Sequence, residues 1–227
     1  MNYLAIGLII IIIVIIYYVY YYLTNTSLTS GLQELNKPLT VTYDKLINPN
    51  SLTYSYQAWI YLSSPTANST KIFHRGSSDS SYSEFEVDIS GQILTLKAGT
   101  GSVAPTQIMT ITTNFPIQKW TYLVVNVSNL STFEAYINGK LAKTVNVSTP
   151  SLDPTSKTSS LYIGNTTFSG SYVTKFIRLP KVLDAKTIWE TYLSGNGLSS
   201  FLATLMPYGL NMSISNGEDV VRVVNMW

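Results

Sequence analysis

A long series of short runs in which polar and apolar residues alternate constrains the fold of this chain more than any other feature. Alternation with a period of two places one set of side chains on a buried face of a β-strand and the other on a solvated face. Glycine, proline, asparagine and serine residues separate the runs, as is typical of strands joined by turns. The runs are Leu39–Tyr43, Thr53–Leu62, Lys71–His74, Glu84–Ile89, Ile93–Lys97, Ile108–Thr112, Thr121–Asn126, Phe133–Ile137, Lys140–Val147, Ser160–Ile163 and Tyr172–Arg178. The pattern predicts an all-β domain of two packed sheets, a sandwich or jelly roll.

Two Asn-Gly pairs predict hairpins. Asn138-Gly139 lies directly between two alternating runs and favours a type I′ turn, because both residues tolerate positive φ. A second pair, Asn216-Gly217, lies between the apolar-rich runs Leu210–Ser215 and Val220–Val224.

One short stretch predicts a helix outside the N-terminal region. Asp184 is a suitable N-cap, Ile188 and Tyr192 fall on one face four residues apart, and Gly195 ends the helix.

The N-terminal 23 residues form an apolar segment that contains no charge. At 1.5 Å per residue, a helix from Leu4 to Leu23 is about 30 Å long, the thickness of a bilayer's hydrocarbon core. Tyrosines crowd one end of the run, where their amphipathic rings suit the headgroup level. A cleaved signal peptide is disfavoured, because no Lys or Arg precedes the run and the run is too long. The sequence predicts a single-pass transmembrane helix over residues 1–23, with lipid contacts that include Leu4, Ile9, Ile13, Tyr17, Tyr22 and Leu23.

The rest of the chain divides into three predicted segments. Residues 24–38 are small and polar and predict a stalk, and residues 39–197 hold the alternating runs and the helix. Residues 198–227 predict a C-terminal hairpin that packs on the jelly roll.

Charge is scarce in this chain: 11% of residues are charged, against about 25% in an ordinary globular domain. The 14 basic and 12 acidic residues do not provide the basic stripe that a nucleic-acid partner requires. The absence of cysteine excludes a disulfide scaffold, thiol catalysis and cysteine-ligated zinc. His74, the single histidine, has no second histidine with which to share a metal, and we interpret it as structural. We therefore expect no nucleic-acid partner and no cofactor.

A set of short motifs carries a family resemblance when taken in chain order. The motifs are Thr53–Ile60 with Trp59, Lys71–Gly76, Lys119–Asn126 with Trp120, Phe133–Lys140, Leu161–Gly164, Phe176–Arg178 and Tyr192–Gly195. Together they resemble the concanavalin A-like lectin/glucanase superfamily, and specifically its laminin G-like domains. The resemblance covers residues 39–197 and implies a two-sheet concanavalin A-like jelly roll with one short helix.

Glucanases of that superfamily carry alternating acidic residues on a concave strand, and Glu84, Glu86 and Asp88 alternate in this way on one strand face. Retaining hydrolysis requires two carboxyl groups about 5–5.5 Å apart. The order departs from the glucanase pattern, since the last acid is an aspartate where a longer glutamate serves as general acid. The simpler interpretation is a solvated strand face, and we expect no enzyme.

Glycan binding is a further possibility that the resemblance implies, because sugar recognition uses aromatic rings together with asparagine, aspartate and backbone groups. Some relatives bind calcium through loop oxygens, for which Asp79 and Asp153 are the candidates here. Trp59 and Trp120 fall in strands where packing is the simpler explanation. The chain has seven Asn-x-Ser/Thr sequons, of which those at Asn25, Asn68 and Asn165 are candidate N-glycosylation sites; the other four are at Asn126, Asn129, Asn146 and Asn211.

The layout of a tyrosine-rich anchor followed by such a domain is similar to membrane-associated minor capsid proteins of large double-stranded DNA viruses, which is an argument by analogy. The sequence-based expectation is a structural, membrane-anchored virion protein at the interface of membrane and capsid. Its partners would be lipid and neighbouring capsid or membrane-complex proteins, which suit a surface low in charge. The alternative is a membrane-displayed, glycan-binding module, and a glucanase-like hydrolase is third.

Overall fold

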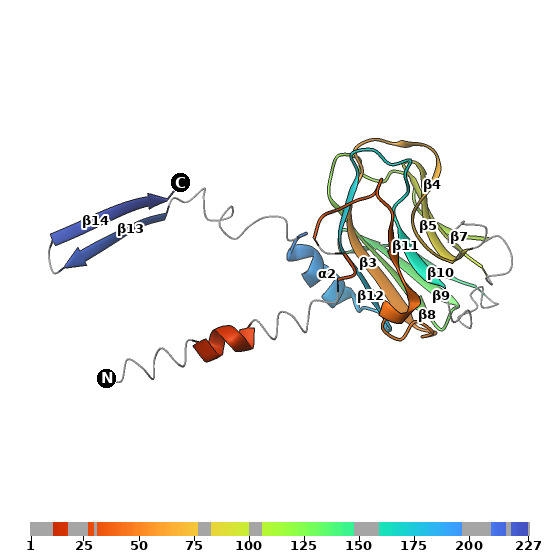
Figure 1. The fold of residues 1–227 in the computed structure, drawn as a ribbon. Coiled ribbons are helices and arrows are strands. Elements are labelled where there is room, and N and C mark those ends of the chain that lie inside the picture. Colours follow the sequence, from red (N-terminus) through yellow and green to blue (C-terminus); the bar gives the residue numbers. More distant parts are fainter. Residues whose placement is uncertain are drawn as a thin grey trace.

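Two six-stranded antiparallel sheets pack face to face and form the domain (Figure 1). The computed structural model describes residues 11–17, 27–29, 31–76, 83–99, 106–147, 159–196, 210–216 and 219–226. Sheet A has the order β1 (Gln33–Glu34), β12 (Tyr172–Leu179), β3 (Tyr54–Tyr61), β8 (Thr121–Ser128), β9 (Thr132–Ile137), β10 (Lys140–Asn146). Sheet B has the order β2 (Leu39–Val41), β11 (Ser160–Ile163), β4 (Thr66–Gly76), β5 (Ser83–Gly91), β6 (Ile93–Ala98), β7 (Thr106–Thr112). The two-sheet, all-β architecture expected from the alternating runs is confirmed.

The hydrophobic core lies between the sheets and is formed by the inward-facing half of each alternating run. Ile60 of β3 and Val87 of β5 are fully buried there, as the period of two requires. Aromatic rings fill the centre: Tyr56 stacks on Phe85 with centroids 5.0 Å apart, and Phe73 meets Phe176 edge to face at 4.9 Å. Such ring pairs give the two layers a specific alignment in addition to burying apolar area.

Helix α2 (Ala185–Leu193) covers part of the outer face of sheet A. The carboxylate of Asp184 accepts a hydrogen bond from the backbone N–H of Thr187 at 3.0 Å, so the predicted N-cap is confirmed. Ile188 is fully buried, and the ring of Tyr192 stacks on Trp59 with centroids 5.7 Å apart. Trp59 therefore belongs to a second, smaller core beneath the helix.

The turn between β9 and β10 has the predicted type I′ geometry. Asn138 and Gly139 have φ values of 51° and 78°, the positive values that this turn requires. The side-chain oxygen of Asn138 accepts a hydrogen bond from the backbone N–H of Tyr122 at 2.9 Å, which fixes the turn against β8. A Cβ atom at position 139 would lie 2.6 Å from the Trp189 ring of α2.

Part of the segment predicted as a stalk belongs to the sandwich instead. Gln33 and Glu34 pair with Val173 and Tyr172 as strand β1, and Leu35 is fully buried. A bridge between Ser27 and Ile177 extends this pairing. The physical reason is that Leu35 gains burial in the core only if the preceding backbone runs along the edge of sheet A. After β2, the predicted strand residues 42 and 43 instead lead into a 3₁₀ turn, η1 (Tyr43–Lys45).

The predicted transmembrane helix falls mostly outside the described residues. Leu4, Ile9, Tyr22 and Leu23 lie outside them, whereas residues 11–17 form a helical stretch in which Ile13 and Tyr17 are exposed. Within the described ranges, we find no helix with the length and apolar character needed to cross a membrane. The anchor stays a prediction of the sequence.

The C-terminal residues contain the two strands that the sequence suggests, β13 (Leu210–Asn216) and β14 (Asp219–Met226). They pair antiparallel with each other in a separate two-stranded sheet. Gly217 of the predicted turn lies outside the described residues, and the packing of this hairpin on the jelly roll stays a prediction.

Candidate functional site

Three carboxylates lie on the outer face of sheet B, along strand β5. Phe85, Val87 and Ile89 point into the core, so Glu84, Glu86 and Asp88 face the other way, as their alternation predicts. The interpretation of this face as solvated is wrong, because the three acidic residues are only 3%, 2% and 3% exposed. Sequence alternation identifies the face but does not say which side chains cover it.

Two lysines on the neighbouring strands cover the carboxylates of Glu86 and Asp88. Lys71 of β4 places Nζ 2.7 Å from Oε2 of Glu86 and 2.9 Å from Oγ of Ser83. Lys97 of β6 places Nζ 3.1 Å from Oε1 of Glu86, and it also pairs with Oδ2 of Asp88. Each lysine thus lies directly across a hydrogen-bonded strand pair from an acid, the arrangement in which opposite charges stabilise a sheet.

These ion pairs shift the pKa of Glu86 and of Lys97. Burial alone would raise the pKa of Glu86, but hydrogen bonds and charge from Lys71, with help from Ser83 and Lys97, outweigh burial and lower it. Burial alone would lower the pKa of Lys97, but Asp88 and Glu86 outweigh it and raise that pKa. A general acid needs a raised pKa near the working pH, and the pKa of Glu86 is shifted in the opposite direction.

The third carboxylate, that of Glu84, is engaged separately. Nε of Arg75 lies 3.5 Å from its Oε2, and the hydroxyl of Ser159 bonds its Oε1. Nearby, His74 is 5% exposed and stacks on Tyr162 with centroids 4.9 Å apart. That packing agrees with the structural role inferred for the single histidine.

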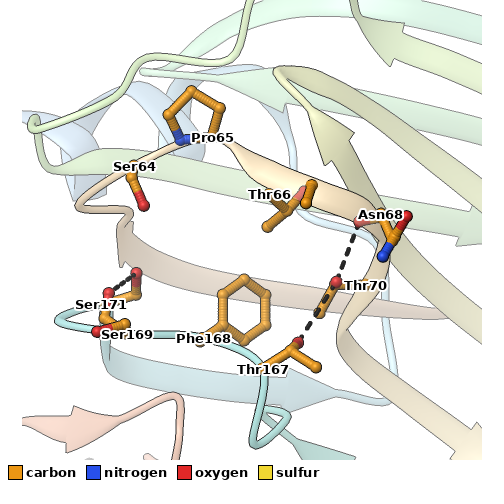
Figure 2. A pocket seen from close by; sticks show the side chains of 10 residues that line it. Ser64, Pro65, Thr66, Asn68, Thr70, Thr167, Phe168, Ser169 and Ser171 are labelled. Carbon is orange, nitrogen blue, oxygen red and sulfur yellow. Dashed lines mark hydrogen bonds between the residues drawn. The ribbon is translucent and has the colours of Figure 1, made fainter.

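An uncharged pocket of about 160 Å³ lies at one end of the sandwich (Figure 2). It forms where the β3–β4 connection and the start of β4 meet the β11–β12 connection, so one strand of sheet B and two connections between the sheets form its walls. The volume is enough for about five water molecules at roughly 30 Å³ each. Hydroxyl groups, one amide and one phenyl ring dominate the lining, and none of the lining residues that the structure describes is charged: Ser64, Pro65, Thr66, Ala67, Asn68, Thr70, Thr167, Phe168, Ser169 and Ser171.

Hydrogen bonds within the protein hold part of this lining in place (Figure 2). The hydroxyl of Thr70 donates to the carbonyl of Asn68 at 3.1 Å and lies 3.4 Å from the hydroxyl of Thr167. Within the described part of the chain, the side chains of Ser64, Asn68 and Ser169 make no hydrogen bond and are exposed. These groups can donate to and accept from a ligand, while the Phe168 ring supplies an apolar surface.

Glycine geometry positions the second wall of the pocket. Gly164 has a φ of 93°, and a Cβ atom there would overlap the backbone oxygen of Leu35. The same Leu35 oxygen accepts a hydrogen bond from the N–H of Asn165 at 2.8 Å. The connection that carries Phe168 is therefore tied to the segment that precedes β2, and only glycine permits the approach.

The remaining predicted site residues fall in different places. Asn68 is exposed at the pocket, and Asn165 is partly exposed in the connection that forms its second wall. Asn25, Asp79 and Asp153 lie outside the described residues. Among the residues placed by the structure, no group of three or more His, Cys, Asp or Glu side chains could hold a metal ion. The pocket itself was not predicted, since serine- and threonine-rich turns carry no sign of which other turn they will meet.

The comparisons with known proteins agree with this architecture. Residues 36–195 match a family model, Laminin_G_3, described as the concanavalin A-like lectin/glucanases superfamily. A search of curated proteins finds no match.

Solved structures with a similar fold include receptor-binding domains of botulinum neurotoxins. The serotype D ligand-binding domain in complex with N-acetylneuraminic acid has a TM-score of 0.56, at 15% identity, over 73% of this chain and 42% of that one. The binding domain of neurotoxin DC in complex with rat synaptotagmin II has a TM-score of 0.53, at 18% identity, over 72% and 42%. This chain spans less than half of each, and identities this low show the fold alone. The family match over most of the chain and the two-sheet architecture lead to one conclusion: the chain belongs to the concanavalin A-like lectin/glucanases superfamily.

Proposed function

We propose that this protein is a membrane-anchored binding module whose concanavalin A-like domain recognises a neutral glycan and does not hydrolyse it. The observation that carries the proposal is the uncharged pocket with its exposed Ser64, Asn68 and Ser169 side chains. A sugar unit has hydroxyl groups on its rim and an apolar C–H face. A pocket that combines hydroxyl and amide groups with the Phe168 ring matches both.

The charge of the lining selects among glycans. A solved structure of similar fold binds N-acetylneuraminic acid, which carries a carboxylate. Recognition of a carboxylate favours a cationic side chain, and none lines this pocket among the described residues. We therefore expect neutral sugars to bind in preference to sialylated ones.

The ion pairs on sheet B support the non-enzymatic part of the proposal. The pKa of Glu86 is lowered by Lys71 and its neighbours, so Glu86 is not ready to donate a proton to a leaving group. Glu86 and Asp88 instead form ion pairs with lysines on the neighbouring strands.

The experiment is a glycan array followed by calorimetry, with the full chain in detergent micelles. The probes for calorimetry are methyl glycosides of glucose, mannose and galactose, N-acetylglucosamine and N-acetylneuraminic acid. We expect binding to at least one neutral sugar, at least tenfold weaker in Asn68→Ala. Asn114→Ala removes an exposed asparagine between β7 and β8 and serves as the matched control. Binding restricted to sialylated glycans, or equal binding by both variants, contradicts the proposal.

The membrane anchor is the second part of the proposal, and its support is the uncharged run Leu4–Leu23. We expect the full chain to stay with membranes after alkaline carbonate washing and to be released by detergent. A charge in the run, as in Ile13→Asp, costs about 2.5–3.5 kcal/mol at a helix centre and should increase the washed-off fraction. Tyr22→Asp, next to the end of the run, is the control and should change extraction less.

A structural role as a membrane-associated virion protein is a second candidate. The observation that favours it is strand β10 at the edge of sheet A, where six of seven residues are exposed and Leu141 is 55% exposed. An edge strand of this kind can pair with a neighbouring protein. A photocrosslinker at position 141 in assembled particles tests it: a crosslink to a shell protein supports this role, and crosslinks only to lipid or water oppose it.

A further inference from the structure

A row of aromatic side chains crosses the outer face of sheet A next to the pocket. Tyr172 of β12 is the direct register partner of Tyr61 of β3. Ile60, the residue before Tyr61, has Thr121 of β8 as its register partner. Because the two strands are antiparallel, Trp120 lies opposite Tyr61. The ring centroid of Tyr61 lies 6.3 Å from that of Tyr172 and 5.6 Å from that of Trp120. The row therefore advances by about one strand spacing, roughly 4.8 Å, at each step.

The face on which these rings lie follows from the strand period. Trp59 lies under α2 on the outer face of sheet A, and Tyr61 is two residues further along β3, so both face outward. Trp120 packs against the same outer cluster. The three rings of the row are partly exposed, unlike Trp59, which is 6% exposed. This part of the outer face thus offers aromatic surface to a ligand.

The row and the pocket are adjacent along the chain. Ser171, which lines the pocket, immediately precedes Tyr172, and its hydroxyl accepts a hydrogen bond from the N–H of Ser63 at 3.2 Å. Ser63 is two residues after Tyr61, and its hydroxyl bonds the carbonyl of Ser169. The backbone segments that border the pocket thus run directly into the strands that carry Tyr172 and Tyr61.

Polar groups border both ends of the row. Glu34 of β1 is the register partner of Tyr172, and its carboxylate is 41% exposed and lies 3.0 Å from Lys37. Lys119, next to Trp120, is exposed. These charged groups can bond sugar hydroxyls, while the rings receive the apolar faces of sugar units.

From this placement we propose that Tyr172, Tyr61 and Trp120 form an extended subsite for a glycan chain whose end unit occupies the pocket. The inference rests on the proposed function, and it names the ligand class as a soluble oligosaccharide of several units. The ring planes of neighbours are inclined by 45° and 47°. Inclined rings suit a chain that turns from unit to unit, whereas the flat surface of a crystalline polysaccharide requires coplanar rings.

The test measures how affinity depends on chain length. The full chain in detergent is titrated with β-1,3- and β-1,4-linked gluco-oligosaccharides of two and six units. We expect the longer chain of at least one linkage to bind about tenfold more tightly. Trp120→Ala should remove most of this gain, and Tyr172→Ala, at the ring nearest to the pocket in the chain, should weaken the binding of both lengths. Trp120→Phe should retain most of it, and thermal unfolding of each variant verifies the fold.

A matched control comes from the opposite sheet. Tyr162 is also partly exposed, but it lies on the outer face of sheet B, stacked on His74, so Tyr162→Ala should not affect the gain. Equal affinities for two and six units, or a gain that survives Trp120→Ala, would overturn the proposal. So would binding of a proline-rich peptide at the row in place of any glycan, since aromatic grooves also receive such peptides.

The outcomes separate this proposal from the one on which it rests. Two-unit binding that depends on Asn68 but shows no length gain refutes the aromatic subsite and keeps the pocket. Six-unit binding that depends on Trp120 but not on Asn68 keeps the row and refutes the pocket. No binding of either length or linkage refutes the aromatic subsite, and it refutes the pocket as well if none of the neutral monosaccharides binds.

Discussion

The ammonium group of Lys71 lies 2.7 Å from Oε2 of Glu86, and the Glu86 side chain is only 3% exposed. Removal of one partner of a buried pair leaves an uncompensated charge, which costs up to about 3–5 kcal/mol. Lys97 still faces Glu86, and Lys71 is itself partly exposed. We therefore expect Lys71→Met to lower the free energy of unfolding by about 2 kcal/mol, less than the full cost.

The matched control for that substitution is Lys186→Met. Lys186 and Glu190 form an ion pair at 3.8 Å on α2, with side chains 83% and 62% exposed. Such a pair contributes at most about 0.5 kcal/mol. Urea denaturation of the full chain measures both variants, and equal losses would contradict the importance of burial in the Lys71–Glu86 pair.

The same cluster predicts how stability depends on pH. The pKa of Glu86 is lower in the folded protein than its ordinary value of 4.5, so the unfolded chain binds more protons in acid. The contribution of Glu86 is complete above the ordinary value and is lost as the pH falls through the folded pKa. Lys97 behaves in the opposite sense, because its raised pKa gives a contribution that is lost only as the pH rises above the ordinary value of 10.5.

Urea denaturation between pH 7 and pH 3 checks the acidic side of this dependence. We expect the free energy of unfolding to fall with acid in the wild type, and to fall less steeply in Glu86→Gln, which has no carboxylate to protonate at that position. Parallel curves for the two proteins would show that other carboxylates account for the acid sensitivity.

Gly164 and Gly91 form a matched pair for backbone strain. Both have positive φ, 93° and 62°, but a Cβ at Gly91 meets no atom within 4 Å, whereas at Gly164 it overlaps the Leu35 carbonyl. Gly91→Ala should cost about 1 kcal/mol for its backbone conformation alone. Gly164→Ala should cost about 2–4 kcal/mol and weaken sugar binding, because the Phe168 wall must move. Thermal unfolding and calorimetry measure the two effects, and similar losses in both variants would contradict this account.

The sequons differ in accessibility and should differ in glycosylation. Asn68 is exposed and Asn165 is partly exposed. The sequon at Asn126 is 1% exposed, and its side-chain amide donates to the carbonyl of Leu183 at 2.8 Å. With a secretion signal in a eukaryotic host, we expect glycans at Asn68 and Asn165 and none at Asn126. Peptide mass spectrometry after glycosidase treatment reads each site; a modified Asn126 in folded protein would be inconsistent with its buried bond.

The strands that could be predicted from the sequence are those with a strong period of two. Thr121–Asn126 and Glu84–Ile89 alternate clearly and become β8 and β5. Strand β1 could not be predicted, because it has only two residues, Gln33 and Glu34, and both are polar. These residues form a strand because they pair with β12. The first half of β4 was missed for a related reason, since Asn68 and Ser69 interrupt the apolar pattern.

The candidate sites, too, could be predicted only in part, because their completion depends on contacts between distant segments. The shared face of Glu84, Glu86 and Asp88 was predictable from spacing, but the lysines that cover it were not, because they depend on the register of β4 and β6 against β5. The pocket and the aromatic row arise from contacts between distant segments, residues 64–70 with 167–171 and Trp120 with Tyr61. Local sequence patterns do not predict which distant residues will be in contact.

Gly139 connects two events that are usually separate, the closure of a hairpin and the docking of a helix. A side chain at this position would overlap the Trp189 ring, so the turn packs directly against α2. The indole of Trp189 is 39% exposed and lies over the end of the β9–β10 hairpin. The chain has four tryptophans, so the difference in fluorescence between the wild type and Trp189→Phe reports on that edge of the sandwich without an added label.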